Sequence, residues 1–142
     1  MTSTPYVSTK KVAQAGVYTL CFNTPLASLA AADFITSLII PHAFKVIDIK
    51  SMPTVAATTP TRYATLTAKI DGTAVPGAVL AMTSANQTPI GKVTVATATD
   101  LAPNGLNYGA AGSAISVTGS SISAFGEGSA TIMITLQNLE DA

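Results

Sequence analysis

The sequence predicts an all-β protein, an antiparallel sandwich of about eight strands in a single domain. Its 142 residues are the usual size of one domain. Small residues, β-branched residues and turn formers dominate, with 24 alanines, 21 threonines, 12 serines, 10 glycines and 8 prolines. Apolar and polar residues alternate over short runs between turn signals, and no long run keeps a helical period. A chain of this length can bury enough core to fold without a disulfide or a metal.

The N-terminal residues differ from the rest. Residues 1–15 are polar, carry Lys10 and Lys11 in succession and show no period. We therefore expect a flexible arm over 1–15, followed by the sandwich domain over 16–142. Two interpretations stay open, because the arm could order on a partner or be a frayed terminus without a role. Under the first interpretation, Tyr6, Lys10 and Lys11 are the candidate protein-interface residues.

The first strand is expected at Val17–Asn23 (VYTLCFN), where alternation gives one face richer in large apolar side chains. A short helix is expected next, at 24–32, with Thr24 as its N-cap and Pro25 at its first position. The run LASLAAA in this segment has good helix propensity but no apolar stripe. A loop between the two sheets therefore stays an alternative for the same residues.

The middle of the chain contains a hairpin signal and a strand breaker. Strands are expected there at Ile35–Ile40, Phe44–Met52, Tyr63–Ile70 and Thr73–Met82. Asp71-Gly72 lies between two apolar runs, which is the strongest short-range signal for a hairpin. Pro76-Gly77 interrupts the strand that follows, so we expect that strand to be bulged or at a sheet edge.

The last strand shows the cleanest alternation in the chain. The remaining strands are expected at Lys92–Ala98, Ala114–Thr118 and Ala130–Gln137. Residues 101–112, rich in Gly, Ala and Asn, are expected to form a loop. In the last strand Ile132, Ile134 and Leu136 share one face, so we expect this face to point into the core.

Neither the only cysteine nor the only histidine indicates chemistry. Cys21 lies between Leu20 and Phe22, so we expect a small buried apolar residue and not a reactive thiol. His42 follows Pro41 in an expected turn, and its sequence neighbours supply no nucleophile or carboxylate. We expect a solvated loop histidine and not a general base.

No motif for a metal, a cofactor or a catalytic nucleophile is present. One Cys and one His cannot supply four zinc ligands, and the seven acidic residues are scattered without calcium-loop spacing. A divalent-cation site built by trimer symmetry stays an alternative. The glycine-bearing loops at 104–112 and 124–129 lack the Lys of a P-loop and the third Gly of a dinucleotide motif. We therefore predict no enzyme activity, no catalytic or metal-binding residues and no cofactor.

Charge is scarce and balanced. Charged residues make up 10% of the chain, against about 25% in ordinary soluble domains, and the formal net charge is zero. The few Lys and Arg do not cluster as a nucleic-acid groove requires, and no segment suits a membrane. We expect neither partner, and the absence of an apolar signal core predicts synthesis in the cytoplasm. So few charges protect poorly against self-association, which favours a subunit packed in an assembly, with a secreted domain as the alternative.

Three segments carry a resemblance to a known family. Residues 34–52 (FITSLIIPHAFKVIDIKSM) give a strand, a proline-bearing corner and a second strand. Residues 65–83 (TLTAKIDGTAVPGAVLAMT) and 128–137 (GSATIMITLQ) follow in order. Together the chain over about 16–140 resembles the small jelly-roll decoration, or cement, proteins of tailed bacteriophage capsids, and related head-fibre base domains. The resemblance rests on the texture and order of strands, without a signature motif.

The resemblance implies an eight-stranded jelly roll made of two four-stranded sheets, with no catalytic residues. It implies a homotrimer on the capsid surface of a virion, made in the host cytoplasm, with the major capsid protein as partner. Such proteins stabilise the shell by clamping neighbouring capsid subunits. A head-fibre or tail subunit is one alternative. A carbohydrate-binding sandwich module is another, although the chain has no Trp and only Tyr6, Tyr63 and Tyr108 as candidate exposed platforms.

Overall fold

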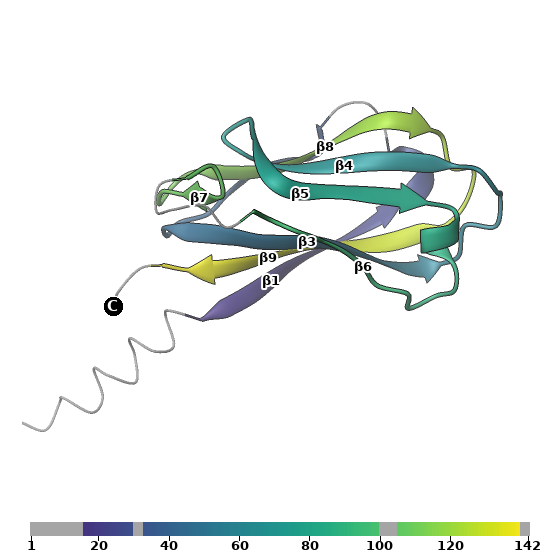
Figure 1. Ribbon diagram of the computed structural model, residues 1–142, viewed down its shortest axis with the longest axis horizontal. Coiled ribbons are helices and arrows are strands. Elements are labelled where there is room, and N and C mark those ends of the chain that lie inside the picture. The colour runs from purple at the N-terminus through teal and green to yellow at the C-terminus, as the bar shows by residue number, and fades with distance from the viewer. Residues whose placement is uncertain (1–15, 30–32, 100–104, 140–142) are drawn as a thin grey trace, which may run out of the picture.

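Nine antiparallel strands form two stacked sheets in the computed structural model, which describes residues 16–29, 33–99 and 105–139 (Figure 1). Sheet A contains, in spatial order, β1 (Val17–Pro25), β9 (Ser129–Asn138), β3 (Phe44–Val55) and β6 (Thr94–Thr97). The short strand β7 (Tyr108–Gly109) also pairs with β3. Sheet B contains, in spatial order, β2 (Asp33–Ile39), β8 (Ala114–Ser123), β4 (Tyr63–Ile70) and β5 (Thr73–Thr83). Two single 3-10 turns, η1 (Leu26–Ser28) and η2 (Ala85–Gln87), complete the described elements.

The strand pairing is that of a jelly roll. Four antiparallel pairs, β1 with β9, β2 with β8, β3 with β6 and β4 with β5, wrap as a double strand around the core. The predicted fold class is therefore confirmed, and each of the eight expected strands has a counterpart among the nine observed. Sheet A contains one strand more than the two four-stranded sheets implied by the resemblance.

The additional strand, β7, lies in the segment 101–112 that was expected to be a loop. Tyr108 pairs with Lys45 and Gly109 with Phe44, at the beginning of β3. β6 pairs only with Asp48 to Ser51, so it leaves this end of β3 open for another strand. Gly109 suits the place because a Cβ there would overlap the Phe44 ring, which is fully buried.

The core lies between the sheets and follows the alternation that the sequence predicts. Ile132, Ile134 and Leu136 of β9 are all fully buried, as expected from the pattern. Leu66 and Ala68 of β4, in the other sheet, belong to the same core cluster and are equally inaccessible to solvent. Burying these apolar side chains is the main favourable term in folding such a sandwich.

The helix expected at 24–32 is wrong in its described part. β1 runs through Pro25, and only Leu26–Ser28 forms a 3-10 turn; 30–32 lie outside the described residues. The Leu26 N–H donates to the Gly128 carbonyl at 3.0 Å, and the Leu26 side chain is fully buried. Pairing with β9 thus continues across the predicted helix start, and this tertiary contact overrides the local helix propensity.

The two turn signals of the middle segment are confirmed. Asp71 and Gly72 have φ of 50° and 81°, as a tight hairpin turn requires, and they connect β4 to β5. β5 is an edge strand, and its register against β4 shifts beside Pro76-Gly77. A Cβ on Gly77 would lie 2.6 Å from the Thr97 carbonyl oxygen. The missing side chain lets β5 approach the end of β6, where Thr99 N–H donates to the Pro76 carbonyl at 2.7 Å.

Replacing Gly109 by alanine should destabilise the fold by about 1–3 kcal/mol, because the new methyl group overpacks the buried Phe44 ring. Urea unfolding measures this change. Gly126→Ala is the matched control, since a Cβ at Gly126 meets nothing within 4 Å, and its effect should stay within about 0.5 kcal/mol. Equal stability of the two variants would contradict the close packing of β7 on β3.

Candidate interaction surface

Four exposed apolar side chains lie at one end of the sandwich, where β1 and β3 begin and β2 and β9 end. They are Val17, Ile39, Leu106 and Leu139, with exposed fractions of 59%, 59%, 53% and 40%. We call these four residues the apolar rim. The backbone brings their segments together, since Asn138 N–H donates to Gly16 O at 3.0 Å and Leu139 N–H to Ala43 O at 2.9 Å. Figure 1 shows this end on the left, beside β7. Because exposed apolar surface is where folded chains most often bind partners, this end is the candidate interaction surface.

A hollow opens inside this end. It has a volume of about 360 Å³ and is lined by Ala43, Tyr108, Gly109, Ala110 and Leu139. The Lys45 ammonium lies 5.8 Å from the centre of the Tyr108 ring, a cation–π geometry that holds the ring in place. The hollow presents one aromatic ring, one leucine and small side chains, which suits packing against a protein more than it suits chemistry.

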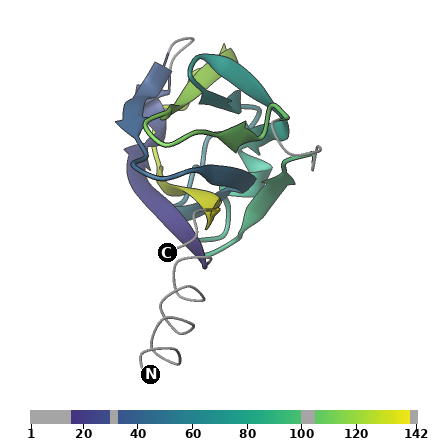
Figure 2. The same ribbon diagram turned by 90° about the vertical axis from the view of Figure 1, so that its left-hand side faces the viewer.

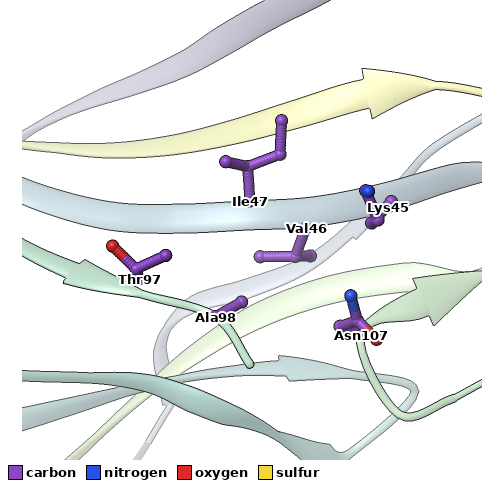
Figure 3. A pocket seen from close by; sticks show the side chains of 6 residues that line it. All are labelled: Lys45, Val46, Ile47, Thr97, Ala98 and Asn107. Atoms are coloured by element: carbon purple, nitrogen blue, oxygen red, sulfur yellow. The ribbon is translucent and has the colours of Figure 1, made fainter. Parts of the chain in front are cut away.

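A second hollow lies along β3 near the end of β6 (Figure 3). Its volume is about 170 Å³, smaller than the roughly 300 Å³ at which small-molecule sites begin. It is lined by Lys45, Val46, Ile47, Thr97, Ala98 and Asn107. In the close-up, Ile47 projects to the opposite side of β3 from Val46, so these residues do not converge on one point. This hollow provides no constellation of acid, base and nucleophile.

His42 is half-buried and hydrogen-bonded, so the expectation of a solvated loop histidine is wrong. Its Nδ1 lies 3.0 Å from the Ala43 carbonyl oxygen and its Nε2 lies 2.8 Å from the Tyr18 hydroxyl. The two rings meet edge to face, with centroids 5.5 Å apart. With its hydrogen on Nδ1, the imidazole donates to the Ala43 carbonyl and its Nε2 accepts a hydrogen bond from the Tyr18 hydroxyl. Burial raises the pKa of Tyr18. Through its hydrogen bond and ring contact with Tyr18, His42 connects β1 to the turn between β2 and β3.

Cys21 is exposed, so the expectation of a buried residue is also wrong. Along β1 the half-buried residues are Tyr18, Leu20 and Phe22, and the positions between them face solvent. Cys21 pairs with Met133 of β9 on the outer face of sheet A. Successive side chains of a strand point to opposite faces of the sheet, so Leu20 and Phe22 point inward and Cys21 points outward. The apolar neighbours of Cys21 in the sequence therefore do not indicate that Cys21 is buried.

Three of the four described acidic side chains accept hydrogen bonds at loops or strand edges, and the fourth, Asp48 of β3, lies 3.7 Å from the Lys50 ammonium. Both carboxylate oxygens of Glu127 accept hydrogen bonds, from the backbone N–H groups of Thr58 and Thr59 and from their hydroxyls, at 2.6–3.1 Å. Asp71 accepts from the Ala114 N–H at 2.9 Å, and Asp33 accepts from the Thr118 hydroxyl. Within the described ranges no group of three His, Cys, Asp or Glu side chains could hold a metal ion.

Glu127 therefore connects two loops at the end of the sandwich opposite the apolar rim. Hydrogen bonds from the Thr59 backbone and hydroxyl, followed by those from Thr58, hold the pKa of Glu127 below its ordinary value. The Ala114 N–H lowers the pKa of Asp71 in the same way. Each carboxylate is thus stabilised in its charged form by donors from a segment distant in sequence.

The candidate interface residues from the sequence, Tyr6, Lys10 and Lys11, lie outside the described residues. The sequence reasoning missed the apolar rim. One residue of the rim could have been noticed in the sequence. Leu106 is a large apolar residue in a segment rich in glycine and asparagine, where an apolar side chain is expected to be exposed. The other rim residues fall at strand ends, where alternation does not show whether a neighbouring strand covers them.

Comparison with known proteins supports the fold. One solved structure, described as "Cyanophage Pam1 capsid asymmetric unit", contains a chain similar to this one with a TM-score of 0.51 and 13% sequence identity. The similarity covers 86% of this chain and 84% of that chain. No family model and no curated protein sequence matches the chain. In the part of the chain that the structure describes, no helix is long and apolar enough to cross a membrane.

Glu127→Gln should lower stability more at neutral pH than at acidic pH. The pKa of Glu127 is lower folded than unfolded, so its stabilising contribution is present above the ordinary value of 4.5. This contribution disappears as the pH falls through the folded-state pKa. Urea unfolding of both proteins at pH 7 and at about pH 3 measures the difference. A difference that does not change with pH would show that the charge of Glu127 has no part in holding the loops.

Proposed function

We propose that the chain is a non-enzymatic capsid decoration protein of a tailed phage. It binds the outside of the capsid through the end that carries the apolar rim and the arm 1–15. It stabilises the shell by clamping neighbouring subunits of the major capsid protein, with its copies arranged as trimers on the capsid surface. The virion is then its place of action and the host cytoplasm its place of synthesis.

The observation that carries this proposal is the apolar rim on an otherwise charge-poor jelly roll. Val17, Ile39 and Leu139 are large apolar side chains that a free monomer would expose to water at a cost. Leu139 also lines the hollow at this end, together with Tyr108 and small side chains, and such apolar and aromatic groups are typical of an interface core. Few long charged side chains would have to be immobilised on binding, so the entropy cost of packing is small.

The arm belongs to the same end. Gly16, from which residues 1–15 continue, is hydrogen-bonded to Asn138 next to Leu139. Fully extended, fifteen residues span at most about 50 Å, enough to reach beyond a neighbouring domain of this size. Tyr6 provides an apolar ring and Lys10 and Lys11 provide charge for contacts with the capsid.

A decoration protein of this kind clamps through several modest contacts. The rim contacts one capsid subunit, and the arm contacts the next. Linking the two contacts makes the second one intramolecular, so that avidity exceeds either affinity alone. A trimer repeats both contacts around one axis of the capsid lattice and closes the assembly.

Phage particles prepared without the protein should lose infectivity faster on heating, and the purified protein should restore their half-life. A chain lacking residues 2–14 should restore it poorly, because the arm contact is gone. Cryo-electron microscopy of the restored particles should show the protein in groups of three on the capsid surface. A full-length variant with Tyr6, Lys10 and Lys11 all changed to Ala separates the contribution of these side chains from that of arm length.

Two results would contradict different parts of this proposal. Full binding and protection by the arm-deleted chain would remove the arm from the interface and leave the capsid role intact. Absence of the protein from purified wild-type particles, measured by mass spectrometry, would overturn the capsid role itself.

A further inference from the structure

Besides the two-residue strand β7, four strands lie at the edges of the two sheets, and three of these four carry features that discourage pairing with another chain. β6 is only four residues long. β5 is bent at Pro76-Gly77 and bonded there to Thr99. β2 has two register shifts and begins with the charged Asp33. Short length, bulges, proline and charge are the usual means by which edges avoid pairing with other chains.

β1, the fourth edge, has none of these features before its last residue, Pro25. Its nine residues, Val17–Pro25, carry no charge, and their register against β9 is unbroken from end to end. The strand lies along one flank of the sandwich (Figure 2). Among residues 16–29, 33–99 and 105–139, β9 is the only strand that pairs with it. A long, uncharged and regular edge is a template for another strand.

The parity of β1 shows which backbone groups remain available. The Gly16 carbonyl accepts from Asn138 and the Leu26 N–H donates to Gly128, so even-numbered residues direct their backbone groups to β9. Odd-numbered residues therefore present N–H and C=O groups to the open edge. These residues are Val17, Thr19, Cys21 and Asn23, together with the carbonyl of Pro25.

We propose that β1 pairs antiparallel with β1 of a second copy, about a two-fold axis at Cys21, so that the two A sheets join into one. In this register the numbers of two opposed residues add up to 42. Cys21 then faces its own copy, and Thr19 of each copy faces Asn23 of the other. All of these are odd-numbered positions, so each opposed pair can exchange two backbone hydrogen bonds.

A second copy fits this edge because the strand is complementary to itself. The register keeps inward-facing residues opposite inward-facing ones, and Leu20 of each copy meets Phe22 of the other. Both side chains are only partly buried in the single chain and pack against its core. The pairing covers them further, and no like charges meet, because β1 carries none. A charged or irregular partner strand would match this edge less well.

The proposed two-fold contact is independent of the capsid role. It uses the long edge of sheet A, whereas capsid binding uses the end formed by the apolar rim and the arm. The two surfaces share only Val17, the first residue of β1. On a capsid, the β1 contact would connect copies that belong to neighbouring trimers. In solution, where no capsid holds the trimers, the chain should be a dimer of about 29 kDa, twice the 14.3 kDa of one copy.

Two matched double variants test the contact and its register. In Thr19→Lys/Asn23→Lys each new lysine faces a lysine of the other copy, so the dimer should dissociate to a monomer. In Thr19→Lys/Asn23→Glu each lysine faces a glutamate, so the dimer should persist. Both variants change the same two exposed positions, and their melting curves establish that both are folded. Light scattering after size exclusion measures the masses of both variants and of the wild type.

The native cysteine provides an independent readout. Opposed residues of a hydrogen-bonded pair have Cα atoms about 5.5 Å apart, within disulfide reach. Mild oxidation should therefore link wild type and the Lys/Glu variant into a covalent dimer through Cys21, and should leave the Lys/Lys variant unlinked. Cys21→Ser should abolish the link while the dimer mass in solution remains.

The proposal would be overturned if the Lys/Lys and Lys/Glu variants had the same mass, or if the wild type were monomeric at high concentration. If the Lys/Lys variant fails to fold, Cys21→Lys replaces it, because its ammonium meets its own copy. Its mass is then compared with that of Cys21→Ser. None of these results depends on whether the protein is found on phage particles.

Discussion

The position of the last strand between two much earlier ones is the constraint on which the rest of the structure depends. β9 pairs with β1 from Val17↔Gln137 to Pro25↔Ser129 and with β3 along nearly its whole length. Because β9 lies between β1 and β3, sheet A cannot form as one sheet until the C-terminal residues pair. Until then, sheet B has no complete apolar face of sheet A to pack against. Non-local pairing of this kind makes folding slow, because loop-closure entropy is lost before the contacts form.

That constraint separates what the sequence predicts from what it leaves open. Alternation is a local property, so the strands, the Asp71-Gly72 turn and the inward face of β9 could be predicted. Pairing partners are not local. The helix prediction at 24–32 failed because Leu26 bonds to Gly128, about a hundred residues away. β7 was missed because its two residues become a strand only beside the open end of β3.

The errors about the candidate site residues have the same origin. The surroundings of His42 depend on Tyr18, which lies on another strand and provides both a hydroxyl and a ring face. The exposure of Cys21 depends on its face of β1 being the outer one. Local composition placed His42 in solvent and Cys21 in the core, whereas in the fold His42 is half-buried and Cys21 is exposed. The apolar rim likewise becomes a surface only when four strand ends meet.

The low content of charged residues can be related to how the edge strands of the two sheets are protected from pairing. A soluble monomer usually keeps other chains away with charged side chains spread over its surface, and this chain has few. It relies on geometry instead, with the bend at Gly77 closing one flank and the register shifts of β2 interrupting another edge. Bends and register shifts protect only the strand in which they occur, whereas charged side chains spread over the surface would repel another chain from every edge. Because β2, β5 and β6 are protected and β1 is not, pairing with another chain is directed to β1. The proposed register then fixes how the two strands align. In the capsid role that we propose, this arrangement would leave one edge open for packing while the other edges are protected from unwanted pairing.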